Sequence, residues 1–167
     1  MRWTPLVLAL SLMFSACKAG GEYQKGQRNE SAVDRGETNG RMFDFVSNKP
    51  DGDDWQIRVR GNSLWASYSD EEKSDDLGTK RLSSSETTKL WDLIDAIDIA
   101  GRKKGKADED EGYVQLRLRE PGEGDDGESH KIFLVYVSRT TEDEDVIALA
   151  EYLQELISKY TKEKPNF

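Results

Sequence analysis

Residues 55–69 read WQIRVRGNSLWASYS, and this stretch predicts the β-hairpin from which the rest of the fold can be worked out. Apolar and polar side chains alternate on both sides of Gly61 and Asn62, as is typical of strands with one buried face. These two residues suit a two-residue turn. With that turn, Arg58 lies opposite Trp65 on the polar face. The buried face is then expected to hold Trp55, Ile57, Val59, Leu64, Ala66 and Tyr68.

Four further segments have the composition of strands, and turn residues or charged loops separate them. Residues 132–137 read IFLVYV without a polar interruption, which indicates a strand that is central or covered on both faces. Residues 70–76 are highly charged and are expected to form a loop. The four strands are expected at residues 42–46, 79–82, 113–119 and 131–137, the second of them brief.

Two amphipathic helices are predicted, each preceded by an N-terminal capping pattern. Residues 83–86 read SSSE, and apolar residues then recur at helical spacing up to Ile97, with Gly101 as the expected stop. Residues 141–144 read TEDE and precede a second apolar stripe that ends at Tyr160. The element order β-β-β-(β)-α-β-β-α predicts an α+β fold, in which two helices pack on one face of an antiparallel meander sheet.

The N-terminus has the layout of an export signal. Arg2 precedes the apolar run 6–14, which is too short for a membrane span of about 20 residues. The small residues 15 and 16 then precede Cys17, the single cysteine of the chain. This arrangement resembles the lipobox of bacterial lipoproteins, although Phe14 stands where that family usually has leucine. Ordinary cleavage by signal peptidase is the alternative.

The resemblance implies that residues 1–16 are a signal peptide and that Cys17 becomes the lipid-modified first residue of the mature protein. Lys18 is not the aspartate that retains many lipoproteins at the inner membrane, so the outer membrane of the cell envelope is favoured. Residues 17–41 are polar and have no apolar period, which predicts a flexible tether. Residues 42–167 are expected to form a single α+β domain and suggest no named family.

The charge and cysteine content exclude several classes of partner. The chain has 33 acidic and 24 basic side chains and a net charge of −9, and loss of Arg2 with the leader would make it −10. An acidic protein lacks the basic footprint that nucleic acid requires. It gains nothing from an anionic membrane surface, so the membrane partner is reached through the lipid on Cys17. A disulfide within the chain is also excluded, because it needs a second thiol and the chain has one cysteine.

Signals for catalysis and for metal or cofactor binding are weak. His130 is the only histidine, and it lies at the start of a strand beside an acidic turn, where a solvated side chain is favoured over a general base. The acidic runs do not follow the EF-hand order, and no zinc spacing or phosphate-binding glycine loop occurs. We therefore expect no enzyme activity, no metal and no cofactor.

The outer face of the predicted sheet gives the main functional signal. Its polar positions bring together residue types that are enriched in binding hot spots. They suggest a surface for an acidic envelope protein, peptide or glycan. The alternative is structural: Arg58 stacks on Trp65, and the other arginines pair with nearby acids. The candidate binding surface consists of Arg58, Arg60, Trp65, Arg117 and Arg119.

Together these features predict a lipid-anchored, non-enzymatic binding or structural module of the cell envelope. Two alternatives remain open. One is an inhibitor or immunity-type lipoprotein that binds an exported enzyme. The other is a hydrolase whose carboxylates come together only in the fold, and a deep pocket with two buried acids would favour it.

Overall fold

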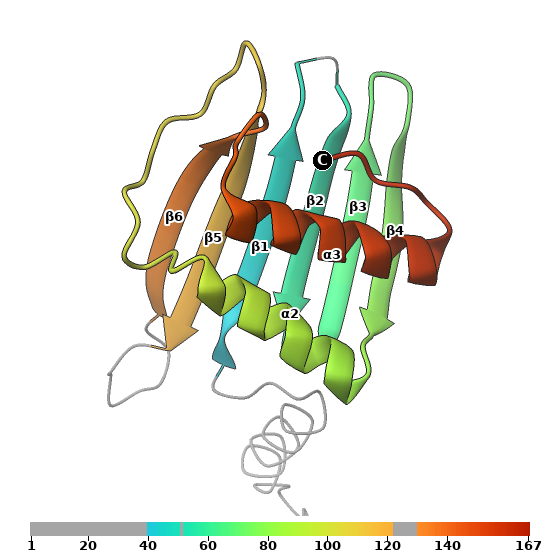
Figure 1. Cartoon of the computed structure of the whole chain (residues 1–167). Helices are drawn as coiled ribbons and strands as arrows, with labels where there is room; N and C mark the ends of the chain where they lie inside the picture. The colour runs from blue at the N-terminus through green and yellow to red at the C-terminus, as the bar shows by residue number, and fades with distance from the viewer. Residues whose placement is uncertain (1–39, 51, 122–129) are drawn as a thin grey trace, which may run out of the picture.

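The computed structural model describes residues 40–50, 52–121 and 130–167, which form a six-stranded antiparallel sheet with two helices across one face (Figure 1). The strand order is β4-β3-β2-β1-β5-β6. The predicted signal peptide, Cys17 and most of the tether lie outside the described residues. In chain order the elements are β1 (Met42–Asn48), β2 (Asp54–Arg60), β3 (Ser63–Ser69), β4 (Ser74–Arg81), α2 (Ser84–Ala96), β5 (Tyr113–Pro121), β6 (His130–Ser138) and α3 (Glu144–Thr161).

The predicted hairpin is confirmed as β2 and β3, with the expected register. Arg58 pairs with Trp65, and Ile57 pairs with Ala66. Gly61 opens the two-residue turn with a φ of 54°, a value that glycine adopts without steric cost. The α+β class, with helices packed on one face of an antiparallel meander, is confirmed as well.

The hydrophobic core lies between the sheet and the two helices. Phe43 and Phe45 of the central strand β1 are fully buried in it. The ring of Phe167, which follows α3 near the C-terminus, packs 4.9 Å from the ring of Phe45 and 5.9 Å from that of Trp55. The last residues of the chain therefore close the core on the helix side of the sheet.

The helices are also linked to each other through Glu86. Its carboxylate completes the predicted capping box with Ser83 at the start of α2. It also accepts hydrogen bonds from the Lys159 ammonium and the Tyr160 hydroxyl of α3. The bond from Lys159, with those from Ser83, lowers the pKa of Glu86 to about 2. A single carboxylate thus caps one helix and holds the second.

Both helices differ from the prediction at one end. The helix α2 ends at Ala96 rather than near Gly101, because Asp98 already adopts a left-handed conformation with a φ of 51°. The helix α3 is capped by Asp143 and not by Thr141. The Asp143 side chain accepts from the backbone N–H groups of the first helical turn, and Arg102 holds it in place.

The expectation that residues 131–137 form a central or doubly covered strand was wrong, because β6 is an edge strand. Its apolar run arises because one face packs on the core while the other places Ile132, 63 % exposed, on the surface. The loop from residue 102 to 112 runs beside the outer edge of β6 (Figure 1). There the Tyr136 N–H donates to the Lys104 carbonyl over 2.7 Å.

The edge strand β4 begins at Ser74 and so includes residues expected to be loop. Its pairing with β3 shifts at a bulge between Ala66 and Ser67. The bulge breaks the alternation of side chains, and on an edge strand charged residues can face solvent on both sides. Both effects remove the alternation of apolar and polar residues by which a strand is predicted from a sequence.

Across the described residues, neither helix combines the length and the apolar character that crossing a bilayer requires.

We predict that Gly105→Ala destabilises the protein by about 2–4 kcal/mol, because the new Cβ would meet the backbone and could not be accommodated by a side-chain movement. Gly105 has a φ of +70°, and a Cβ there would lie 2.4 Å from the Tyr136 carbonyl oxygen. Urea denaturation measures the loss. Gly78→Ala is the matched control: Gly78 has a φ of +72° with open space around it, so about 1–2 kcal/mol is expected. Equal losses in the two variants would contradict the proposed close contact.

Candidate functional site

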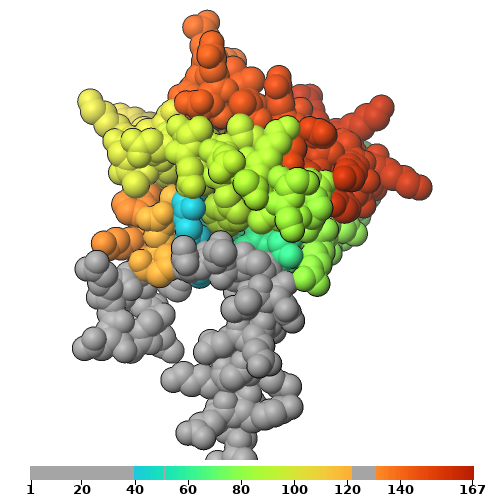
Figure 2. Space-filling view, turned by 60° about the horizontal axis from the view of Figure 1, so that its bottom comes forward, coloured from blue at the N-terminus to red at the C-terminus, as the bar shows by residue number. Residues whose placement is uncertain are grey.

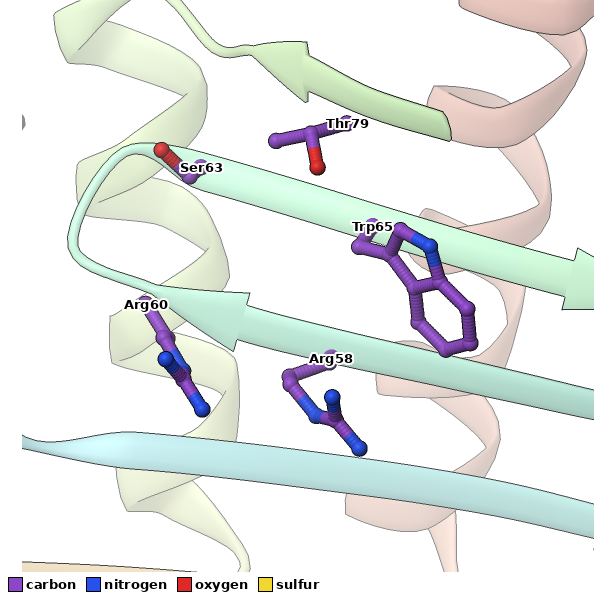
Figure 3. Close-up of a pocket in the computed structure, with 5 residues that line it drawn as sticks. All are labelled: Arg58, Arg60, Ser63, Trp65 and Thr79. Carbon is purple, nitrogen blue, oxygen red and sulfur yellow. The ribbon is translucent and has the colours of Figure 1, made fainter. Parts of the chain in front are cut away.

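The sheet face opposite the helices, termed the open face, carries three rows of side chains defined by the strand register. Figure 3 shows part of it, with the helices behind the sheet. Read from β4 to β6, the middle row is Thr79, Trp65, Arg58, Asp44, Arg117 and Leu134. One flanking row is Asp76, Ser67, Gln56, Val46, Gln115 and Tyr136, and the other is Arg81, Ser63, Arg60, Met42, Arg119 and Ile132.

Asp44 lies at the centre of the open face and is only 3 % exposed. It projects there because β1 alternates, with Phe43 and Phe45 turned to the core. Three arginines from the two neighbouring strands surround its carboxylate. Arg58 Nε donates to Oδ1 over 2.9 Å, while Arg117 Nε and Arg119 Nη2 donate to Oδ2 over 2.9 and 2.6 Å.

The arginines keep Asp44 ionised. Burial acts to raise the pKa of this carboxyl, but the hydrogen bonds from Arg119 and Arg58 and the charge of Arg117 outweigh it and hold the pKa below its ordinary value. A general acid needs the opposite shift. Among the described residues Asp44 is the one buried carboxylate, so they contain no pair of buried acids of the kind a glycosidase-type hydrolase uses.

The cluster around Asp44 contains more positive than negative charge. Three guanidinium groups meet one carboxylate, and the side chains of Arg58 and Arg117 remain 41 % and 37 % exposed. Arg119 Nε is buried without a hydrogen-bond partner among the described atoms. The three rows hold five arginines and two aspartates. The open face is therefore positive, although the chain carries a net charge of −9.

A hollow of about 220 Å³ lies on the β2–β4 side of the open face. Trp65 forms one wall, with the Arg58 guanidinium 5.3 Å from its ring centroid. The indole N–H of Trp65 donates to Asp76 over 2.8 Å, which fixes the ring. Arg60 contributes a guanidinium that contacts no other described residue through a hydrogen bond or ion pair. The hollow is lined by Arg58, Arg60, Ser63, Trp65 and Thr79 (Figure 3).

The β6 side of the open face is apolar. Leu134 lies opposite Arg117, and exposed Ile132 lies opposite Arg119. Tyr136 completes the strip and packs edge-on against Tyr113, with 5.6 Å between ring centroids. An apolar strip thus borders the arginine cluster directly.

The five residues of the predicted binding surface all lie on the open face. Arg58, Arg60 and Trp65 line the hollow, whereas Arg117 and Arg119 lie beyond Asp44. The structural alternative also describes much of this surface, because Arg58 stacks on Trp65 and three of the arginines pair with one acid. That acid, Asp44, was not predicted from the sequence. The sequence pattern that could have identified Asp44 is a single carboxylate between two phenylalanines in a predicted strand.

Other sequence-based candidates add little to this site. The backbone of His130 pairs with Pro121 at the end of the β5–β6 ladder, two residues beyond the pair of Arg119 and Ile132. Cys17 lies outside the described residues. Within the described part of the chain, no group of three or more potential metal ligands comes together.

No known protein family and no curated protein matches the chain. The function of the protein is therefore inferred from the geometry of the open face.

We predict that Asp44→Asn lowers the free energy of unfolding by about 2–3 kcal/mol at neutral pH, because it removes the anion that three arginines share. The folded-state pKa of Asp44 is below the ordinary 3.8, so its stabilisation is complete above that pH and is lost as the pH falls further. Denaturant unfolding from pH 7 to pH 2 measures both quantities. A difference between wild type and variant that does not shrink on acidification would contradict the assignment.

Proposed function

We propose that this protein is a lipid-anchored, non-enzymatic binding module of the bacterial cell envelope, and that it holds an acidic protein partner on its open face. The observation that carries the proposal is the surplus of arginine around Asp44. Three guanidinium groups share the one carboxylate of Asp44. The neighbouring Arg60 forms no ion pair with an acid among the described residues.

The charge distribution supports an acidic partner. Most of the protein surface repels an acidic molecule, since the chain has a net charge of −9, whereas the open face attracts it. Charge complementarity of this kind orients the partner during approach and suppresses other modes of contact. A carboxylate from the partner would also give the surplus arginines an acceptor.

The shape and composition of the open face support a protein rather than a small molecule or a glycan. A sheet of six strands is about 24 Å wide between its outer strands. A surface of this width offers an area on the order of 600 Å², which is at the lower end of the area that each partner buries in an ordinary protein interface. The apolar strip of Ile132, Leu134 and Tyr136 beside arginine and tryptophan matches the composition of such interfaces.

The proposed anchor fits the way the described chain begins. Arg41 holds the start of β1 in place, with ion pairs to Asp95 of α2 and Glu120 of β5 and with its guanidinium 4.9 Å from the Trp91 ring centroid. Figure 2 shows this start at the surface beside α2. The preceding tether of about 24 residues would span roughly 25–30 Å if flexible. A tether of this length lets the domain reach a partner near the membrane. The outer membrane is favoured because Lys18, and not aspartate, follows Cys17.

An inhibitor or immunity-type role is the second candidate, and the open face favours it as well. Such a protein would cover an acidic surface of one exported enzyme, and its deletion would leave the cell vulnerable to that enzyme. A hydrolase finds less support, because the buried carboxylate is paired with arginines and its pKa is lowered.

We predict that the native protein begins at Cys17 and carries acyl chains on it. Intact mass measurement should show the acyl mass, and a maleimide reagent should not label the unfolded protein, because Cys17 is the only cysteine. The Cys17→Ser variant should leave the membrane fraction. A free thiol, or a leader still attached to the wild-type protein, would refute the anchor.

We predict that Arg60→Glu and Trp65→Ala each weaken retention of the partner by tenfold or more, the order expected for interface hot spots (about 1.4 kcal/mol per tenfold). Both substitutions leave the Asp44 cluster paired, so the fold should persist. The measurement is quantitative affinity capture from envelope extract with the full chain.

Lys106→Glu is the control for that experiment, since it makes the same charge change as Arg60→Glu but lies in the exposed loop beside β6. It should retain the same proteins as the wild type. The proposal fails if the two face variants capture the same proteins, in the same amounts, as this control.

A further inference from the structure

The hollow beside Trp65 contains hydrogen-bond donors that the described residues leave unused. Arg58 contributes only Nε to Asp44, so its two terminal nitrogens have no acceptor within the described part of the chain. The Arg60 guanidinium and the hydroxyl groups of Ser63 and Thr79 likewise have no partner there. None of the five lining residues is an acid. The hollow therefore presents several donors and a positive charge, and lacks an anion.

The arrangement of these donors is directional. In Figure 3, Arg58 and Arg60 line the β2 side of the hollow, while Ser63 and Thr79 line the β3–β4 side. Asp44 accepts a hydrogen bond from Arg58 Nε, and the Cζ atom of Arg58 lies 5.3 Å from the centroid of the Trp65 ring. Arg58 is thus held in place before a ligand arrives, whereas the exposed Arg60 is free to close on it.

The size of the hollow restricts the ligand to a small group. About 220 Å³ is less than the 300–1,000 Å³ typical of sites for drug-sized molecules. It suits one acidic side chain, whose methylene groups can pack on the Trp65 ring while the carboxylate reaches the arginines. The planar fork of a guanidinium matches the two oxygens of a carboxylate.

We propose that this hollow is a carboxylate subsite that takes one glutamate or aspartate side chain of the partner. The inference rests on the proposed function and deepens it, because it names the chemical group of the partner that the open face binds. Arg60 binds the carboxylate directly, together with the terminal nitrogens of Arg58. Asp44 is a positioning residue that acts through Arg58.

The test uses small probes with the full chain in detergent micelles, followed by NMR. The probes are N-acetyl-glutamate N-methylamide, the matching glutamine compound, and inorganic phosphate at equal ionic strength. The signals observed are the indole N–H of Trp65, assigned with Trp65→Phe, and the Nε–H groups of Arg58 and Arg60. We expect saturable shifts with millimolar affinity for the glutamate probe, and no saturation with the glutamine probe.

Arg60→Gln should weaken binding of the glutamate probe at least fivefold. Lys131→Gln is the matched control, because it removes one charge from an exposed residue of β6 and should leave the affinity unchanged. Thermal melting of both variants checks that they fold. The proposal is overturned by shifts that do not saturate, by equal affinity in Arg60→Gln and wild type, or by phosphate binding as tightly as glutamate.

Failure of this inference can be told apart from failure of the proposed function. If the hollow does not bind the glutamate probe but Arg60→Glu still loses the captured partner, the subsite is refuted and the binding face remains. If the probe binds but the face variants capture the same proteins as wild type, the subsite remains and the proposed partner binding is refuted.

Discussion

The ion cluster at Asp44 joins the two parts of the sheet. The strand β1 pairs with β2 on one side and β5 on the other, so it connects the meander β1–β4 to the later hairpin β5–β6. The hydrogen bonds of Asp44 span both strand pairs, because Arg58 lies on β2 while Arg117 and Arg119 lie on β5. The opposite face of β1 supplies Phe43 and Phe45 to the centre of the core. One strand therefore organises the core on one face and the charged cluster on the other.

The carboxylate clusters around Asp44 and Glu86 differ in their charge balance. Glu86, on the helix side, meets one ammonium group and several neutral donors, so its cluster is close to neutral and serves the packing of α2 on α3. Asp44 meets three guanidinium groups. A buried ion pair adds little net stability, because desolvation offsets much of the attraction. A surplus of cations adds less still, so the arginines around Asp44 are better suited to the proposed partner than to stabilising the fold.

The sequence predicted the features of this fold that depend on neighbouring residues. The register of the β2–β3 hairpin follows from a two-residue turn and from alternation, and the cap of α2 follows from residues 83–86. The candidate surface was also predicted, since residues on the outer side of a hairpin can be identified from their period of two. Its chemical centre was not, because Arg117 and Arg119 lie 73 and 75 residues from Asp44 in the chain. Only the strand order β2-β1-β5 brings these residues together.

The wrong prediction of the position of β6 in the sheet has a similar physical cause. An unbroken apolar run shows that both faces of a strand carry apolar side chains, but not which of them is covered by protein. In this fold the core covers one face, while Ile132, Leu134 and Tyr136 lie on the open face. The apolar run therefore reflects the side chains that β6 places on the open face, and not a central position of the strand in the sheet.

The same features explain why the open face suits a different molecule better than a second copy of this chain. Two such faces would bring their surplus arginines together, and like charges across an interface are unfavourable. The sheet edges are also protected against pairing: the loop from residue 102 to 112 hydrogen-bonds to β6 at Tyr136, and β4 carries a bulge and charged side chains. An acidic partner meets neither obstacle, because its charge balances the arginines and its contact is with the face rather than the edges. The surplus of arginine around Asp44 thus disfavours self-association through the open face and fits the proposed partner of opposite charge.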